Sequence, residues 1–320
     1  MNPALTIVVP LYNSAATLER LISELSALKV DGGHELVLVN DGSRDNTVEV
    51  CERLMRTATL PITLVKLSRN FGEHHAVMAG LHHASGDFIV TMDDDLQNPP
   101  SEVLKLVNHA REGKYEVVYS YYDDKKHESW RNFGSWLTNR VADFLLDKPK
   151  GLYLSSFRCV SAFVAKEICR YDGPFAYVDG LILQVTQSIG RVLVEHASRE
   201  DGRSGYTLRK LVKLWLNMFV NFSVIPLHLA TMLGFAMAAL GFIYTIAVIW
   251  ERLTHGTPLG WSSLMAALTV FSGTQLLVLG MAGEYIGRLY LTANKRPQFV
   301  VKEVVRSGSA NSSATPDKTR

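Results

Sequence analysis

Three consecutive carboxylates, Asp93, Asp94 and Asp95, directly follow the short apolar run 88–92. The run predicts a buried strand. Carboxylates crowded at the end of such a strand repel one another, and a divalent cation with hard oxygen ligands, Mg²⁺ or Mn²⁺, would offset that repulsion. Because alternate strand residues point the same way, Asp93 and Asp95 can face one ion while Asp94 faces elsewhere. The alternative interpretation is an acidic turn with no bound ion.

Polar residues also follow the other strands that the sequence predicts. Apolar runs predict strands at 5–9, 36–39 and 62–67, with helices between them at about 16–28, 45–55 and 74–84. This alternation indicates a mostly parallel sheet covered on both faces. Ligands of such sheets bind beyond the carboxyl ends of the strands. We therefore expect one site that combines the acidic run with Tyr12, Asn13, Asp41, Ser43, Arg69 and Asn70.

Composition and missing signatures exclude several classes of protein. The chain contains 33 basic and 31 acidic residues, so its net charge does not indicate a nucleic-acid partner. It has neither a Gly-x-Gly-x-x-Gly sequence nor a phosphate-binding Gly-Lys-Ser/Thr loop. A dinucleotide-binding Rossmann enzyme and a P-loop ATPase are therefore disfavoured.

Four short motifs occur in a fixed order: Pro10-Leu-Tyr-Asn13, Asn40-Asp-Gly-Ser43, Arg69-Asn-Phe-Gly72 and Asp93-Asp-Asp-Leu-Gln97. Together they resemble the nucleotide-sugar half of glycosyltransferase family 2. The continuation of the last motif to Pro100 resembles the polyprenyl-phosphate glycosyltransferases, which include dolichyl-phosphate mannose synthases and bacterial undecaprenyl-phosphate sugar transferases. The resemblance extends from residue 4 to residue 305 and implies an α/β catalytic domain with the GT-A (Rossmann-like) fold.

The resemblance implies a donor site at the sheet edge. Asp93, Asp95 and Gln97 match the metal ligands that hold the donor diphosphate through Mg²⁺ or Mn²⁺, and the two aspartates are also the main catalytic candidates. Asp41 would hold the base or ribose, and Asn40, where the family usually has Asp, is expected to tune nucleotide choice. The predicted nucleotide-sugar-binding residues are Pro10, Tyr12, Asn13, Asp41, Ser43, Asn70, Asp93 and Asp94.

The resemblance also implies an acceptor site. On an expected helix over 129–146, Arg131 and Ser135 share a face at i, i+4, although a surface Arg with no function is an equal alternative. The segment Ser155-Ser-Phe-Arg158 resembles the family's Gly-Phe-Arg acceptor segment, and 199–206 resembles its Arg-x-x-Gly-x-Ser-Lys-Tyr loop. The predicted acceptor- and diphosphate-binding residues are Arg131, Ser135, Arg158, Arg199, Arg203 and Ser204.

Two residues of the family pattern are missing from this chain. Gly151-Leu-Tyr-Leu154 replaces an Asp that is proposed as a base, and Gly205 replaces a Lys whose charge Arg203 is expected to supply. A phosphomonoester has a second pKa of roughly 6, so it is already an anionic nucleophile at neutral pH. It needs positioning and charge neutralisation rather than deprotonation. Asp179 is the weaker catalytic candidate, as a substitute acidic group.

The last third of the chain is far more apolar than the rest. Residues 206–222 combine an apolar stripe at helical spacing with basic residues outside it, which predicts an amphipathic interfacial helix; a core-facing helix is the alternative. Residues 225–250 carry no charge and exceed the roughly 20 residues that a membrane span needs, and 264–281 predict a second span. Glu284 and Arg288, spaced i, i+4, are expected to form a local ion pair.

These patterns predict four parts. They are a cytoplasmic GT-A catalytic domain at 1–205, an interfacial helix at 206–223, two transmembrane helices at 224–290, and a cytoplasmic C-terminal arm with a disordered tail at 291–320. Basic residues flank the outer ends of the two spans, so the positive-inside rule places both termini in the cytoplasm. Residues 296–302 are expected to form a short strand or arm, against a neighbouring subunit if the chain forms a homo-oligomer.

The functional hypothesis is inverting transfer of a sugar from a UDP- or GDP-linked donor to a polyprenyl (undecaprenyl) phosphate. The resemblance implies a multi-pass enzyme of the bacterial cytoplasmic (inner) membrane that contacts the lipid bilayer and serves cell-envelope glycan or lipopolysaccharide modification. One alternative is transfer to another membrane lipid, and another is a non-catalytic scaffold that binds a nucleotide sugar. A processive polymer synthase is disfavoured, because two spans are too few for a channel and the Gln-x-x-Arg-Trp signature is absent.

Overall fold

The computed structural model describes residues 3–122, 152–195, 225–255 and 260–307 of the 320-residue chain. It divides into two compact units. The first comprises Met1–Gly205 together with Pro297–Arg320, and the second comprises Tyr206–Arg296.

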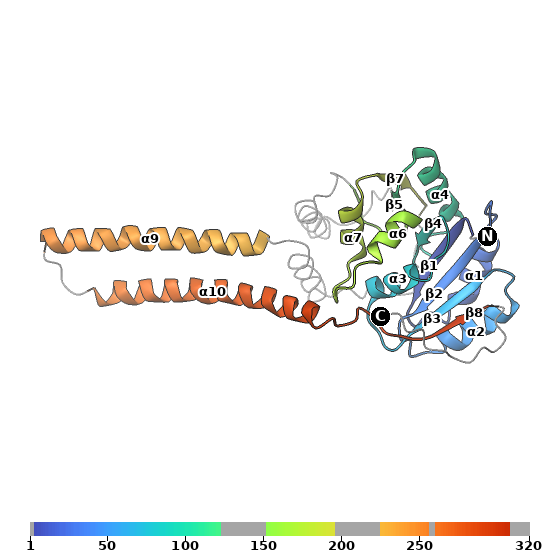
Figure 1. The fold of residues 1–320 in the computed structure, drawn as a ribbon, viewed down its shortest axis with the longest axis horizontal. Coiled ribbons are helices and arrows are strands. Elements are labelled where there is room, and N and C mark those ends of the chain that lie inside the picture. The colour runs from blue at the N-terminus through green and yellow to red at the C-terminus, as the bar shows by residue number, and fades with distance from the viewer. Residues whose placement is uncertain (1–2, 123–151, 196–224, 256–259, 308–320) are drawn as a thin grey trace. The chain divides into compact units, whose positions relative to one another are not determined.

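The first unit is built on an eight-stranded sheet in the order β7-β5-β6-β4-β1-β2-β3-β8 (Figure 1). Its centre consists of parallel neighbours, because β1 pairs with β2 and β4, and β2 pairs with β3. The four strands predicted from apolar runs are thus confirmed, as is the α/β GT-A-like sheet. Their bounds are β1 Leu5–Leu11, β2 His34–Asn40, β3 Ile62–Leu67 and β4 Phe88–Thr91.

An antiparallel strand makes this half of the sheet mixed. Strand β6 (Arg158–Ser161) lies between β4 and β5 (Val117–Tyr121) and runs antiparallel to both, while β7 (Ile189–Leu193) pairs in parallel with β5. In the β4–β6 register Thr91 faces Arg158, so the residues before β6 lie beside the acidic run that follows β4.

A C-terminal strand is present as β8 (Val301–Arg306), although it overlaps the predicted range of 296–302 only at its first two residues. It pairs antiparallel with β3 of its own chain, which differs from the expected contact with a neighbouring subunit. Lys66 on β3 joins the two strands through an ion pair with Glu303 of 2.9 Å.

Helices cover both faces of the sheet (Figure 1). On β1, Ile7 and Val9 point into one apolar cluster and Val8 into the other, as the two-residue period of a strand requires. The first cluster takes in residues of α1, α2 and α4, and the second takes in residues of α3, α6 and α7. The helix bounds are α1 Leu18–Ser26, α2 Thr47–Thr57, α3 Glu73–Leu81, α4 Ser101–Gly113, α6 Ala162–Ile168 and α7 Val178–Val185.

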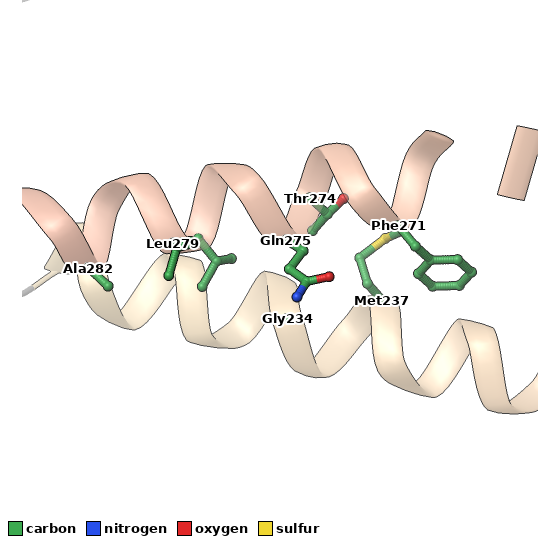
Figure 2. Close-up of a pocket in the computed structure, with 8 residues that line it drawn as sticks. Gly234, Met237, Phe271, Thr274, Gln275, Leu279 and Ala282 are labelled. Carbon is green, nitrogen blue, oxygen red and sulfur yellow. The ribbon is translucent and has the colours of Figure 1, made fainter. Parts of the chain in front are cut away.

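The second unit is a hairpin of two long helices, α9 (Ile225–His255) and α10 (Trp261–Ala293). Figure 2 shows a groove between them, into which Gln275 of α10 and Met237 of α9 project. Glu284 and Arg288 form the predicted ion pair at 2.9 Å.

The helices of the predicted hairpin are therefore present, but the predicted membrane crossing is not confirmed. Among the described residues, no helix is both long enough and apolar enough to span a membrane.

Candidate active site

The acidic run lies where β4 ends, and each of its carboxylates accepts a hydrogen bond. Asp93 Oδ2 accepts from Ser156 Oγ at 2.7 Å, and Asp94 Oδ2 accepts from Ser14 Oγ. Asp95 Oδ1 accepts the backbone N–H of Gln97 at 3.2 Å. The bonds come from three different segments of the chain, so the orientation of the carboxylates is set by the folded sheet edge rather than by the local turn alone.

The loops after β1 and β2 are bound to each other, as the sheet-edge argument predicts. The backbone N–H of Asn13 donates to Ser43 Oγ at 3.0 Å, and Asn13 Oδ1 accepts the N–H of Arg44 at 2.8 Å. Asn13 has a φ of 57°, a left-handed conformation that Asn tolerates better than most residues. Next to it the Tyr12 residue is 46% exposed. The structure thus places an accessible aromatic ring beside two loops fixed by side-chain hydrogen bonds.

Asp41 connects the loops after β2 and β3. The side chain is buried, and its two oxygens accept the backbone N–H groups of Phe71 at 2.7 Å and Gly72 at 2.8 Å. These bonds give Asp41 a structural task that the sequence did not reveal. Its expected contact with the base or ribose stays a prediction.

Gly42 sits at the closest approach of these two loops, and Gly42→Ala is expected to destabilise the first unit. Its φ is +65°, and an added Cβ would lie 2.5 Å from Arg69 C and 2.6 Å from Asn70 N. Left-handed strain costs about 1–3 kcal/mol for a non-glycine residue, and the backbone clash adds to it. Gly33→Ala is the matched control, because Gly33 has a φ of +77° but open space at its Cβ. Equal losses of unfolding free energy in chemical denaturation would contradict the predicted clash.

Burial and like charges raise two pKa values at this edge. Burial, reinforced by the charges of Asp93 and Asp95 and opposed by the Ser14 hydrogen bond, raises the pKa of Asp94 to about 6. The pKa of Glu73 is raised to about 7, mainly by the loss of hydration at its carboxyl group and to a lesser degree by the charge of Asp93. Glu73 has this raised pKa although the residue as a whole is exposed to solvent. Sequence reasoning missed Glu73, which begins α3 directly after the Arg69–Gly72 motif. Both carboxyl groups thus gain their raised pKa mainly from burial, with the neighbouring aspartates adding to it.

The donor atoms at this edge fit a divalent ion. Asp93, Asp95 and Gln97 offer two carboxylates and an amide oxygen, the hard ligands that Mg²⁺ and Mn²⁺ prefer. Over the described ranges, no three His, Cys, Asp or Glu side chains converge as a ready-made metal site. Mg²⁺ is commonly held by one or two carboxylates together with substrate phosphates, so the donor diphosphate would complete such a site.

Two further candidate residues, Arg158 and Asp179, lie together in the core. Arg158 Nη1 forms an ion pair with Asp179 Oδ1, which also accepts a hydrogen bond from the Tyr119 hydroxyl at 2.9 Å. Arg158 is 1% exposed. Burial is the largest single effect on the pKa of Arg158 and would lower it, but the charge and hydrogen bond of Asp179, together with the charges of Tyr119 and Glu73, raise the pKa above its usual value. In this arrangement each charge mainly neutralises the other, so the predicted acceptor-binding and acidic roles stay predictions.

His74 lies near this ion pair. Burial lowers the pKa of His74 to about 4, which keeps the ring neutral at physiological pH. The ring meets Tyr177 edge to face at a centroid distance of 4.9 Å. Among the described residues its Nδ1 has no hydrogen-bond partner. Sequence reasoning did not select His74, because its burial depends on contacts distant in sequence.

The other acceptor-side candidates fall outside the described residues. They are Arg131, Ser135, Arg199, Arg203 and Ser204, and the predicted interfacial helix at 206–222 lies outside as well. The residues that the structure does place are those predicted for the donor half, and Asn13, Ser43, Asp41 and the acidic run follow neighbouring strands at one edge of the sheet.

Two family profiles match the sequence. Glycosyl transferase family 2 matches residues 6–169, which include all four motifs of the donor half. The GtrB C-terminal hairpin matches residues 225–289, the α9–α10 hairpin.

Curated relatives match over nearly the whole chain. The undecaprenyl-phosphate 4-deoxy-4-formamido-L-arabinose transferase of Pseudomonas savastanoi pv. phaseolicola is 34% identical over 330 aligned residues, covering 97% of this chain and 95% of the relative. The protein of the same name from Pseudomonas aeruginosa is 33% identical and covers 94% of this chain and 90% of its own length.

Among solved structures, a glucosyl-3-phosphoglycerate synthase from Mycobacterium tuberculosis, in complex with Mn²⁺, UDP and glucosyl-3-phosphoglycerate, is 22% identical. The aligned region covers 67% of this chain and 76% of the synthase chain, with a TM-score of 0.48. This similarity is too low to support an argument about the site of this chain.

Proposed function

This chain belongs to glycosyltransferase family 2, and from that premise we propose that it transfers a sugar from a nucleotide-sugar donor to a polyprenyl phosphate. The observation that carries the proposal is the near-complete match to undecaprenyl-phosphate sugar transferases, which includes both the donor half and the C-terminal hairpin. The relatives' names make a nucleotide-linked 4-deoxy-4-formamido-L-arabinose the first donor to test. The product would serve lipopolysaccharide modification.

The donor half supports this function through the positions of its polar groups. The Tyr12 ring and the joined loops of Asn13 and Ser43 would receive the nucleoside. Asp93 and Asp95, with Gln97, would hold Mg²⁺ or Mn²⁺ against the diphosphate. When bound, that ion would supply positive charge to the departing nucleoside diphosphate.

The chemistry needs no strong base from the chain. An oxygen of the acceptor phosphate forms the new bond to the anomeric carbon while the bond to the nucleoside diphosphate breaks, so the configuration inverts. Since the acceptor is already anionic at neutral pH, the chain must orient it and reduce repulsion between two phosphate groups. The buried Asp179, paired with Arg158, is not required as a base in this scheme.

We propose further that the hairpin associates with the cytoplasmic face of the bacterial inner membrane, with both termini in the cytoplasm. A polyprenyl acceptor resides in the bilayer, and the hairpin exposes large apolar side chains along both helices. They include Met232, Phe235, Phe242, Ile243, Leu268, Leu276, Leu279 and Ile286. Monomeric soluble proteins rarely expose so many large apolar side chains together, and a bilayer would cover them.

The test supplies detergent-purified chain with polyprenyl phosphate, Mn²⁺ and a panel of radiolabelled nucleotide sugars. We expect label in the chloroform-soluble fraction with one donor, dependent on both the lipid phosphate and the metal. Dolichol or undecaprenol without phosphate is the matched acceptor control, and it should remain unlabelled. The absence of lipid-linked label with every donor would overturn the proposed function.

A further inference from the structure

Ser156 is fixed to the end of β4, beside the acidic run. Its backbone oxygen accepts a hydrogen bond from Thr91 Oγ1 at 2.6 Å, and Thr91 is the last residue of β4. Thr91 is also the register partner of Arg158, two residues beyond Ser156. The strand pairing and the Thr91 bond therefore determine where the Ser156 side chain begins.

The neighbouring residues fix the same segment from its other side. Ser155 is buried, and its hydroxyl lies 2.9 Å from Ser120 Oγ on β5 and accepts the N–H of Phe157 at 3.2 Å. Ser120 Oγ also donates to the Phe157 oxygen at 2.7 Å. The segment before β6 is thus bound to both β4 and β5, which leaves the Ser156 backbone little freedom.

From this fixed position Ser156 Oγ donates to Asp93 Oδ2 at 2.7 Å. That length is typical of a hydroxyl bonded to a charged carboxylate. We infer that Ser156 is a positioning residue, which orients the Asp93 carboxylate to receive the divalent ion. The inference rests on the proposed function, in which Asp93 is a metal ligand.

The physical basis is that ligating carboxylates need partners of their own. Groups that hydrogen-bond to metal ligands set their orientation, and loss of such a partner costs roughly 10–100-fold in metal affinity or activity. Asp93 stands in a run of three aspartates that repel one another, and the bond from Ser156 helps to fix the direction of its carboxylate against that repulsion. Ser156 occupies the position where the resembled Gly-Phe-Arg segment has glycine, which could not supply this hydroxyl.

The decisive pair of variants is Ser156→Thr and Ser156→Val, because the two side chains have nearly the same shape and only threonine keeps the hydroxyl. Mn²⁺ affinity of the full-length chain in detergent would be measured with UDP present, by titration of the electron paramagnetic resonance signal of free Mn²⁺. We expect Ser156→Thr to bind as the wild type does and Ser156→Val to bind roughly 10–100-fold more weakly.

Two controls separate the sources of failure. Ser85→Ala removes a hydroxyl that donates to the Glu35 carboxylate at 2.8 Å, before the other end of β4, and should leave Mn²⁺ binding unchanged. Asp93→Asn should abolish it. If Asp93→Asn weakens binding while the threonine and valine variants bind alike, Ser156 has no positioning role and the metal site stands. If Asp93→Asn binds Mn²⁺ as the wild type does, the metal assignment fails, and the inference fails with it.

Discussion

Asp95→Asn is expected to lower metal-dependent turnover roughly 10²–10³-fold, the loss seen when a group that stabilises developing charge is removed. The amide has the same shape and can still accept the N–H of Gln97, which Asp95 Oδ1 accepts at 3.2 Å. What it lacks is the negative charge that attracts a divalent ion. The measurement is transfer of labelled sugar to polyprenyl phosphate across a Mn²⁺ series, with circular dichroism to show that the fold is retained.

Asp87→Asn is the matched control for that experiment. Asp87 is an exposed aspartate directly before β4, so the same change of charge occurs at the opposite end of the same strand. It should leave turnover and metal dependence unaltered. Turnover by Asp95→Asn equal to that of Asp87→Asn, at every Mn²⁺ concentration, would show that Asp95 does not bind the ion.

The first half of the fold could be predicted because its signals are local. Strands β1 to β4 are nearly continuous apolar runs, and each is followed by polar residues that meet at one edge of the sheet. The expectation that Asn13 and Ser43 lie together depends only on strand order and direction, and the 3.0 Å bond between them agrees with it.

Strand β6 illustrates why other parts could not be predicted. Its sequence is Arg-Cys-Val-Ser, with a charged residue that local patterns assign to the surface. Arg158 is nevertheless buried, because Asp179 neutralises it from α7, 21 residues later in the chain. The pattern of apolar and polar residues within this four-residue strand contains no information about a partner so distant in the sequence.

The same reasoning applies to residues of the site that were missed or given other roles. Glu73 begins α3 and lies just beyond the residues that follow β3, so the sheet-edge argument did not select it. Its raised pKa depends first on burial and then on the charge of Asp93, 20 residues later in the chain. Asp41 was expected to face the donor, but its two bonds to the loop after β3 require knowledge of how the strands pair. Functional motifs are visible in sequence, whereas the contacts that hold them in place are mostly nonlocal.

Asp179→Asn is expected to destabilise the first unit by about 3–5 kcal/mol, the cost of removing one partner of a buried ion pair. Arg158 would remain 1% exposed with its guanidinium charge no longer neutralised. The Tyr119 hydroxyl could still donate to the amide oxygen, so the loss is mainly that of the charge. The measurement is the free energy of unfolding in denaturant, together with the transfer rate per folded molecule.

Glu24→Gln provides the comparison for a surface pair. Glu24 bonds to Arg20 at 2.8 Å with both side chains solvent-exposed, and such pairs contribute only about 0–1 kcal/mol. The double change Arg158→Met with Asp179→Leu should recover much of the lost stability, since it removes both charges and keeps the volume filled. If Asp179→Asn is instead as stable as Glu24→Gln but inactive per folded molecule, Asp179 acts in the chemistry. The ion pair would then be a catalytic arrangement rather than the structural one that its burial indicates.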